Sequence, residues 1–298
     1  MTTETTTETL TRTVATRRSS AVTWSRIRPL VIHVVLAGSA LVMLYPVIWM
    51  VVSSLRPGNE IFRDPGILVK DLRIENYRVG WHALTEPFTR YLLNSALVVL
   101  GSIVGNLVSC SMAAYAFARL EFTAKKFWFA IMLLSIMLPI HVVIVPQYIL
   151  FSNLGWINTV LPLVVPKLLA TDAFFVFLMV QFIRGIPREL DEAARIDGCG
   201  KASIFLRIIL PLMVPALATT TIFTFIWTWN DFFSQLIYLT DPHMYTVPVA
   251  LRSFVDSTSS SSWGSMFAMS VVSLVPVFLA FLLGQRFLIK GIATTGIK

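Results

Sequence analysis

Residues 91–118, YLLNSALVVLGSIVGNLVSCSMAAYAFA, contain no charged side chain. The stretch is longer than the roughly 20 apolar residues that a helix needs to cross the ~30 Å hydrocarbon core of a bilayer. Gly101, Gly105, Ser109 and Ala113 recur along it at four-residue spacing, so they form a strip of small side chains on one helix face. The stretch therefore predicts a membrane-spanning helix that packs closely against another helix.

The composition of the whole chain agrees with an all-α integral membrane protein. Of the 298 residues, 56% are hydrophobic and 13% are charged, whereas a soluble domain has roughly 45–50% and ~25%. The net charge of +8 is spread over short segments between apolar runs, which does not fit a basic face that binds nucleic acid. Composition therefore argues against a water-soluble enzyme and against a nucleic-acid partner.

Five further apolar runs bring the predicted number of transmembrane helices to six. The first run is too long for the short apolar part of a cleaved secretory signal. A forty-residue uncharged stretch, 127–166, is divided into two spans by turn-forming residues at 152–155 and 158–159. The predicted spans cover about residues 30–52, 91–118, 127–148, 160–183, 212–239 and 264–285.

The distribution of basic residues predicts that both termini are cytosolic. Of the 24 Lys and Arg residues, sixteen lie in the terminal segments and in the loops on the same side, and seven lie in the opposite loops. Cytosolic segments of membrane proteins carry this excess. We therefore divide the chain into a disordered Thr-rich tail (1–28), a first transmembrane helix with its outer loop (29–90), a core of five transmembrane helices (91–286) and a cytosolic C-terminal tail (287–298).

The loop between the fourth and fifth spans has the pattern of a helix, a turn and a second helix. Acidic residues occupy the early turns of the first helix, where the helix dipole favours them, and Asp191 and Arg195 have the spacing of an ion pair within that helix. Gly198 or Gly200 can end it. The second helix should stop before Pro211. From its composition alone, the loop could equally be a solvated connector.

The order of residues in this loop, 184–211, resembles the EAA loop of binding-protein-dependent ABC importer permeases. The match consists of Glu192-Ala193-Ala194, three residues, Gly198, nine residues, Ile208, one residue and Leu210-Pro211. Paired alanines permit close helix approach, the glycine permits a sharp turn, and Glu192 offers a charge to a basic partner. The resemblance implies that the loop docks on a cytosolic ATPase and transmits nucleotide-driven closure to the membrane helices.

Further segments are similar to the sugar-transporting branch of this family, which is typified by the maltose importer. They are Asn76-Tyr77, Asn94-Ser95, AAYAFARLEF at 113–122, LGWINT at 154–159, WNDF at 229–232 and GIATTGIK at 291–298. The last of these departs from the residues usual in the family. The resemblance implies the type I permease fold of ABC importers in a bacterial plasma membrane. It also implies that the chain forms half of the translocation path for a di- or oligosaccharide.

The same resemblance implies several partners for this chain. They are a second homologous permease, two ATPase subunits that bind ATP and Mg, an extracytoplasmic solute-binding protein and membrane lipid. The chain itself has no G-x-x-x-x-G-K-[ST] phosphate cradle, no nucleophile elbow and no H-E-x-x-H. Its four histidines lack ligand spacing. We therefore expect no catalytic residue, no metal site and no cofactor in this chain.

Polar residues in the fifth predicted span are candidates for the lining of the substrate path. An acidic side chain near mid-membrane costs about 2.5–3.5 kcal/mol, so Asp231 needs a wet or paired setting. Asp231, Asn230 and Gln235 either face the path or stabilise helix packing. Lys167 and Asp172 in the fourth span raise the same question, and there we favour a lysine that snorkels to the interface.

Two other classes of transporter remain open. An ABC importer for a glycerophosphodiester, a peptide or an amino acid would share the loop and differ in its solute. A secondary transporter would need no ATPase, but that class usually shows internal repeats, and the sequence shows none.

Overall fold

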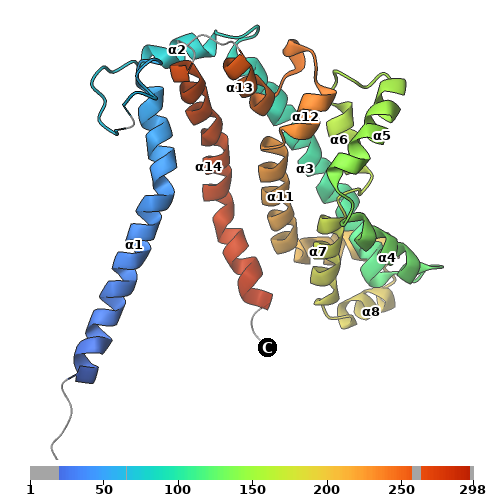
Figure 1. The fold of residues 1–298 in the computed structure, drawn as a ribbon. Helices are drawn as coiled ribbons and strands as arrows, with labels where there is room; N and C mark the ends of the chain where they lie inside the picture. Colours follow the sequence, from blue (N-terminus) through green and yellow to red (C-terminus); the bar gives the residue numbers. More distant parts are fainter. Residues whose placement is uncertain (1–19, 65, 257–262, 296–298) are drawn as a thin grey trace, which may run out of the picture. The chain divides into compact units, whose positions relative to one another are not determined.

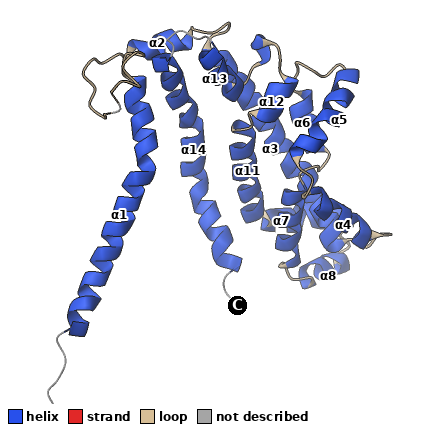
Figure 2. Ribbon diagram, viewed as in Figure 1, coloured by secondary structure: helices blue, strands red, loops and turns tan. Residues whose placement is uncertain are grey.

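The computed structural model describes residues 20–64, 66–256 and 263–295. These residues form helices, turns and irregular segments, and no strand occurs among them (Figure 2). The all-α class predicted from composition is therefore confirmed. The chain forms two compact units, Met1–Trp49 and Met50–Lys298.

Helix α1, Ser20–Ser54, begins in the first unit and ends in the second. Residues 20–28, which were expected to belong to the disordered tail, are helical, and no Gly or Pro interrupts them before Pro29. The remainder of the predicted tail, residues 1–19, lies outside the described residues.

The other helices belong to the second unit (Figure 1). In chain order they are α2 (Glu75–Trp81), α3 (Phe88–Arg119), α4 (Lys125–Ser135), α5 (Ile140–Asn153), α6 (Leu161–Leu168), α7 (Ala173–Arg184), α8 (Glu189–Ile196), α9 (Lys201–Ile204), the π-helix η1 (Phe205–Ile209), α10 (Leu210–Leu212), α11 (Val214–Trp229), α12 (Phe233–Tyr238), the 3-10 helix η2 (Pro242–Met244), α13 (Val247–Asp256) and α14 (Trp263–Thr295). Because α14 continues to Thr295, most of the predicted C-terminal tail is helical.

Four stretches of the described chain are long and apolar enough to cross a membrane, and two bent helix pairs bring the number to six if each pair is one span. The four are Arg28–Ser54, Phe88–Arg119, Leu161–Arg184 and Trp263–Gln285. The bent pairs are Lys125–Ser135 with Ile140–Asn153, at 101°, and Lys201–Leu212 with Val214–Trp229, at 74°.

The fifth predicted span, 212–239, is shorter in the structure than its apolar sequence suggests. Helix α11 ends at Trp229, and α12 begins at Phe233 after a turn. The Asp231 carboxylate accepts a hydrogen bond from the Ser234 backbone N–H at 3.1 Å. A carboxylate in this position satisfies a free N–H at the start of a helix, so the polar residues of this span break it into two helices.

Helix α3 is the centre of the second unit and packs against α6, α7 and α11 (Figure 1). A Cβ added at Gly101 would lie 2.8 Å from Val164, and one added at Gly105 would lie 3.0 Å from the Cβ of Lys167. Both distances are shorter than van der Waals contact allows. The strip of small residues on this helix is therefore a close-packed surface against α6, as predicted.

Candidate functional site: the coupling loop and a polar cavity

Gly198 ends helix α8 in the loop that resembles the EAA loop. Its φ is +82°, a conformation that glycine adopts without steric cost. The Cys199 N–H donates to the Ala194 carbonyl at 2.8 Å, and the Gly198 N–H donates to the Arg195 carbonyl at 3.0 Å. These two bonds are those of a Schellman motif. The predicted helix and turn are confirmed, and Gly198 rather than Gly200 is the residue that ends the helix.

We expect Gly198→Val to lower the yield of ATPase co-purified with the permease, because a β-branched residue at this φ costs about 1–2 kcal/mol. Gly200→Ala is the matched control, since Gly200 has a φ of −76° and nothing within 4 Å of its added Cβ. Pull-down from mild detergent measures the yield. Equal yields for the two variants would show that the turn does not need this conformation.

Glu192, Ala193 and Ile196 lie on the exposed surface of α8. All three side chains are exposed, and Ile196 keeps 86% of its surface accessible. Ala194, by contrast, is buried in the core beneath the loop. Glu192, Ala193 and Ile196 are therefore accessible to another protein.

The end of the EAA-like pattern lies on the next helical segment. Ile208 is half-buried against the core, Leu210 is half-buried and Pro211 is exposed. The expectation that the helix stops before Pro211 is wrong, because the segment continues to Leu212. The π-helix η1 ends at Ile209, two residues before this proline, and its wider turn accommodates the missing backbone donor.

Asp191 forms a buried ion pair with Arg119 of α3, and not the predicted pair with Arg195. Its Oδ2 lies 3.0 Å from the Arg119 Nε, and the two side chains are 6% and 3% exposed. Arg119 also donates from Nη2 to the Ile186 carbonyl at 2.6 Å. The prediction failed because it considered only neighbours within one helix, whereas a buried carboxylate requires a charged partner from wherever the fold supplies it.

Tyr115, one turn earlier on α3, makes a second connection to the loop. Its hydroxyl donates to the Lys201 carbonyl at 3.0 Å. Arg119 and Tyr115 thus bind the loop before, within and after α8. Sequence reasoning did not single out these two residues, although both lie in the segment 113–122 that carries the family resemblance. Through them, the loop is attached to α3, the central helix of the unit.

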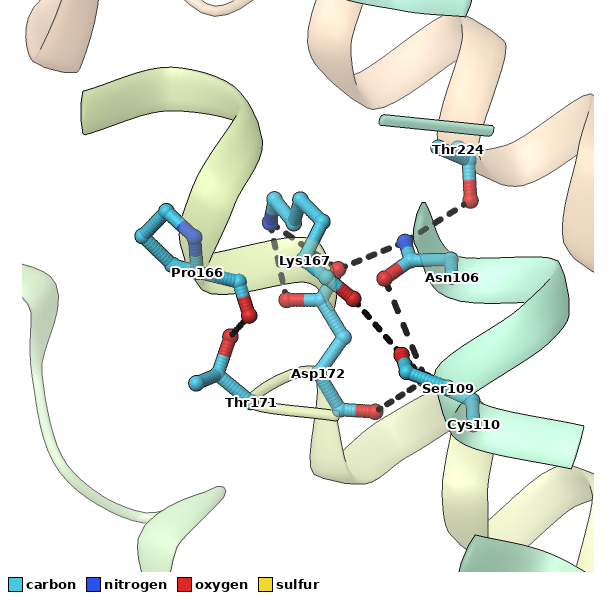
Figure 3. Close-up of polar contacts among 8 residues, drawn as sticks. All are labelled: Asn106, Ser109, Cys110, Pro166, Lys167, Thr171, Asp172 and Thr224. Carbon is cyan, nitrogen blue, oxygen red and sulfur yellow. Dashed lines mark hydrogen bonds and ion pairs between the residues drawn. The ribbon is translucent and has the colours of Figure 1, made fainter. Parts of the chain in front are cut away.

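A cluster of polar side chains lies between α3, α6, α7 and α11 (Figure 3). The Lys167 ammonium donates to both carboxylate oxygens of Asp172, at 2.8 and 2.9 Å. Asn106, which is fully buried, donates to Asp172 Oδ2 at 2.7 Å and to the Thr224 hydroxyl at 3.1 Å. Lys167 is therefore paired and does not simply snorkel. The pair compensates both charges.

Asn230, Asp231 and Gln235 line one cavity of about 620 Å³, together with Lys167. Each also has a local partner. The Asn230 amide donates to the Ile226 carbonyl at 2.8 Å, and the Gln235 amide donates to the Thr228 carbonyl at 2.9 Å. Gln235 is only 2% exposed. Of the three, Asn230 and Asp231 therefore have the more accessible polar groups.

A second cavity of about 330 Å³ shares Lys167 and Asp231 with the first and adds Asp172. Trp227 lines the larger cavity and is 48% exposed. Its ring contacts that of Phe174, with centroids 5.3 Å apart. An aromatic face beside fixed polar groups is a surface that can hold a polyhydroxylated solute. Sequence alone could not distinguish Trp227 from the many lipid-facing aromatics.

Metal ligands are not gathered anywhere in the described part of the chain, where no group of three His, Cys, Asp or Glu side chains is arranged to hold an ion. The long apolar helices and the paired charges between them are those of an integral membrane protein.

The chain belongs to the family of binding-protein-dependent transport system inner membrane components, which matches residues 90–292. It is thus an inner-membrane permease that works with the other components of an ABC transporter. It is 31% identical over 264 residues to the arabinooligosaccharides transport system permease protein AraQ of Halalkalibacterium halodurans, covering 87% of this chain and 92% of that protein.

It is also 31% identical over 270 residues to the sn-glycerol-3-phosphate transport system permease protein UgpE of Brucella abortus (strain 2308), covering 88% of this chain and 95% of that protein. Among solved structures, it resembles a chain of a bacterial ABC transporter that imports the acidic polysaccharide alginate. The TM-score is 0.76 at 23% identity, over 88% of this chain and 96% of that chain. This likeness shows a common fold.

Proposed function

We propose that this chain is one of two permease subunits of an ATP-driven importer for a di- or oligosaccharide. It crosses the bacterial plasma membrane with six type I permease spans, with both termini in the cytosol. The loop 184–211 receives the ATPase, and the permease converts ATPase closure into alternating access. The supporting observation is the α8 helix, which exposes Glu192, Ala193 and Ile196 while Arg119 holds it from inside.

The proposed assembly contains a second homologous permease, two ATPase subunits and an extracytoplasmic solute-binding protein. ATP and Mg bind to the ATPases, so this chain supplies no catalytic group. The contact at the loop involves Glu192, Ala193, Ala194, Gly198, Ile208, Leu210 and Pro211. In this proposal, Gly198 sets the direction of the turn, and Ala194 and Ile208 rest on the permease core.

The choice of a sugar is supported by the cavity and by the relative AraQ, whose name gives arabinooligosaccharides. Trp227, Asn230 and Asp231 offer an aromatic face, an amide and a carboxylate in the same space. The second candidate solute is sn-glycerol-3-phosphate, because UgpE is equally similar to this chain. The cavities contain Asp172 and Asp231 against one cation, Lys167. That balance disfavours a phosphate monoester.

Uptake by the complete transporter in proteoliposomes tests this function. Labelled disaccharides and labelled sn-glycerol-3-phosphate are supplied with the cognate binding protein, with ATP inside. We expect ATP-dependent sugar uptake and little phosphate-ester uptake. Transport of the phosphate ester alone would overturn the choice of solute, and uptake by the permease without ATPases would overturn the importer mechanism.

We expect Asp231→Asn to lower sugar uptake about tenfold while leaving assembly intact, because loss of one charged hydrogen bond costs about 1.5 kcal/mol. The asparagine oxygen can still accept from the Ser234 N–H. Asp241→Asn is the matched control, since Asp241 accepts from the His243 N–H at 2.9 Å in the same capping manner and does not line the two cavities. A loss of assembly without a specific uptake defect would assign Asp231 to packing.

A further inference from the structure

A pocket of about 540 Å³ lies where α3 ends, α4 begins and α7 ends. Three basic side chains line it: Lys125, Lys126 and Arg184. It shares no lining residue with the two cavities near Asp231. Arg184 is the first residue of the loop 184–211, but none of the residues proposed to contact the ATPase lines this pocket.

The charges of this pocket leave an excess of two cations. Lys125 lies 3.2 Å from Glu121, which is the acid of the pocket, and it also donates to the Leu120 carbonyl at 2.7 Å. Lys126 and Arg184 have no anionic partner among the described residues. The pocket is therefore suited to an anion that two basic groups share.

Aromatic side chains form the apolar walls around these cations. The guanidinium carbon of Arg184 lies 5.3 Å from the centre of the Phe129 ring. Phe117 packs between Phe129 and Phe122, at centroid distances of 5.4 and 5.7 Å. The cation–π contact holds the guanidinium over one ring while its N–H groups remain free to donate. Such walls suit a ligand that has a charged group next to apolar chains, as a lipid has.

The pocket lies at the ends of three candidate membrane spans. Phe88–Arg119 and Leu161–Arg184 end there, and Lys125–Ser135 begins there. In Figure 1, α4, α7 and α8 gather at the same end of the second unit. Phe127 and Trp128, which directly follow the two lysines, are 60% and 53% exposed. Aromatic residues mark the depth of the lipid headgroups.

Helix α4 continues from the pocket with an apolar, accessible surface. None of its residues is buried, and Ile131 and Leu134 are 42% and 61% exposed. An acyl chain could therefore lie along α4 below a headgroup that occupies the pocket.

We propose that this pocket binds the phosphate of an anionic phospholipid headgroup, with Lys126 and Arg184 as its ligands and α4 as the surface for its acyl chain. Basic pockets between transmembrane helices on the cytoplasmic side bind anionic lipid headgroups. The proposal rests on the membrane placement given above and not on the identity of the solute. An acidic protein segment would fit the charges but not the exposed apolar face of α4.

The test uses the complete transporter, purified in mild detergent and titrated with dioleoyl-phosphatidylglycerol or dioleoyl-phosphatidylcholine in native mass spectrometry. We expect one tightly retained phosphatidylglycerol. Lys126→Gln with Arg184→Gln should weaken its retention about tenfold or more, since each basic residue near a membrane surface contributes about 1 kcal/mol. Arg63→Gln with Arg90→Gln removes the same charge from exposed residues outside the pocket and outside the loop 184–211 and should have no effect.

Thermal unfolding of each variant shows whether it remains folded. If the double variant does not fold, Lys126→Gln alone is the milder substitution to test. Equal retention in wild type and pocket variant would overturn the proposal, as would equal losses in both double variants. Displacement of the lipid by inorganic phosphate alone would assign the pocket to a soluble anion. Co-purification of an acidic protein in place of lipid would also overturn it. Unimpaired lipid retention with failed sugar uptake would refute only the proposed solute.

Discussion

Arg119→Met is expected to abolish the association of the permease with its ATPases while the chain still inserts into the membrane. The substitution leaves Asp191 as an uncompensated charge at 6% exposure, and breaking one member of a buried ion pair costs about 3–5 kcal/mol. The Ile186 carbonyl also loses the bond that Arg119 donates. We therefore expect α8 to leave its position at the end of α3.

The double variant Arg119→Met with Asp191→Leu separates charge burial from coupling. Replacing a buried pair with apolar residues of similar volume is often neutral or stabilising, so thermal stability should return towards that of the wild type. ATPase binding should also return. If the ion pair is the connection through which α8 moves α3, however, sugar uptake per ATP hydrolysed should stay low. Full recovery of the uptake ratio would show that packing alone transmits the movement.

Glu192→Lys is expected to abolish sugar uptake without reducing the amount of inserted permease. Glu192 is exposed on α8, so reversing its charge costs little in the free subunit. At an interface, placing like charges together costs several kcal/mol. Uptake should therefore fall by about a hundredfold, and the proposed binding protein should no longer stimulate the ATPase.

Asp197→Lys is the matched control for this change, because it makes the same charge reversal on an exposed residue. Asp197 lies about five positions further along the loop, on a different side of the helix axis. Uptake in proteoliposomes and ATPase rate are measured together. Normal uptake and normal stimulation in Glu192→Lys would remove the acidic docking position from the mechanism. Equal defects in both variants would indicate a general dependence on the charge of the loop.

The apolar stretches could be read from the sequence because their cause is local. A run such as 91–118 must satisfy its backbone hydrogen bonds within itself when it lies in lipid, so its length and composition are sufficient to predict a helix. For the end of α8, the sequence offered two glycines, Gly198 and Gly200, and the φ of +82° at Gly198 decided between them.

The interruptions of the spans were harder to predict. Residues 127–148 were expected to form one span, but the chain turns by 101° between α4 and α5, at Pro139. Asp231, which was expected within a span, instead lies in the turn between α11 and α12 and accepts a hydrogen bond from the Ser234 N–H of α12. Hydropathy averages over a window and does not register a single proline or cap.

The sequence alone determined that this is a helical membrane protein and where its small-residue strip lies, because both depend on residues close together in the chain. Only the tertiary structure decided which charges pair and which residues share a cavity. Asp191 is paired with Arg119, and Asp172 is paired with Lys167 and bound by Asn106. A charge removed from water takes whatever partner the packing brings within reach, and that partner is set by helices distant in sequence.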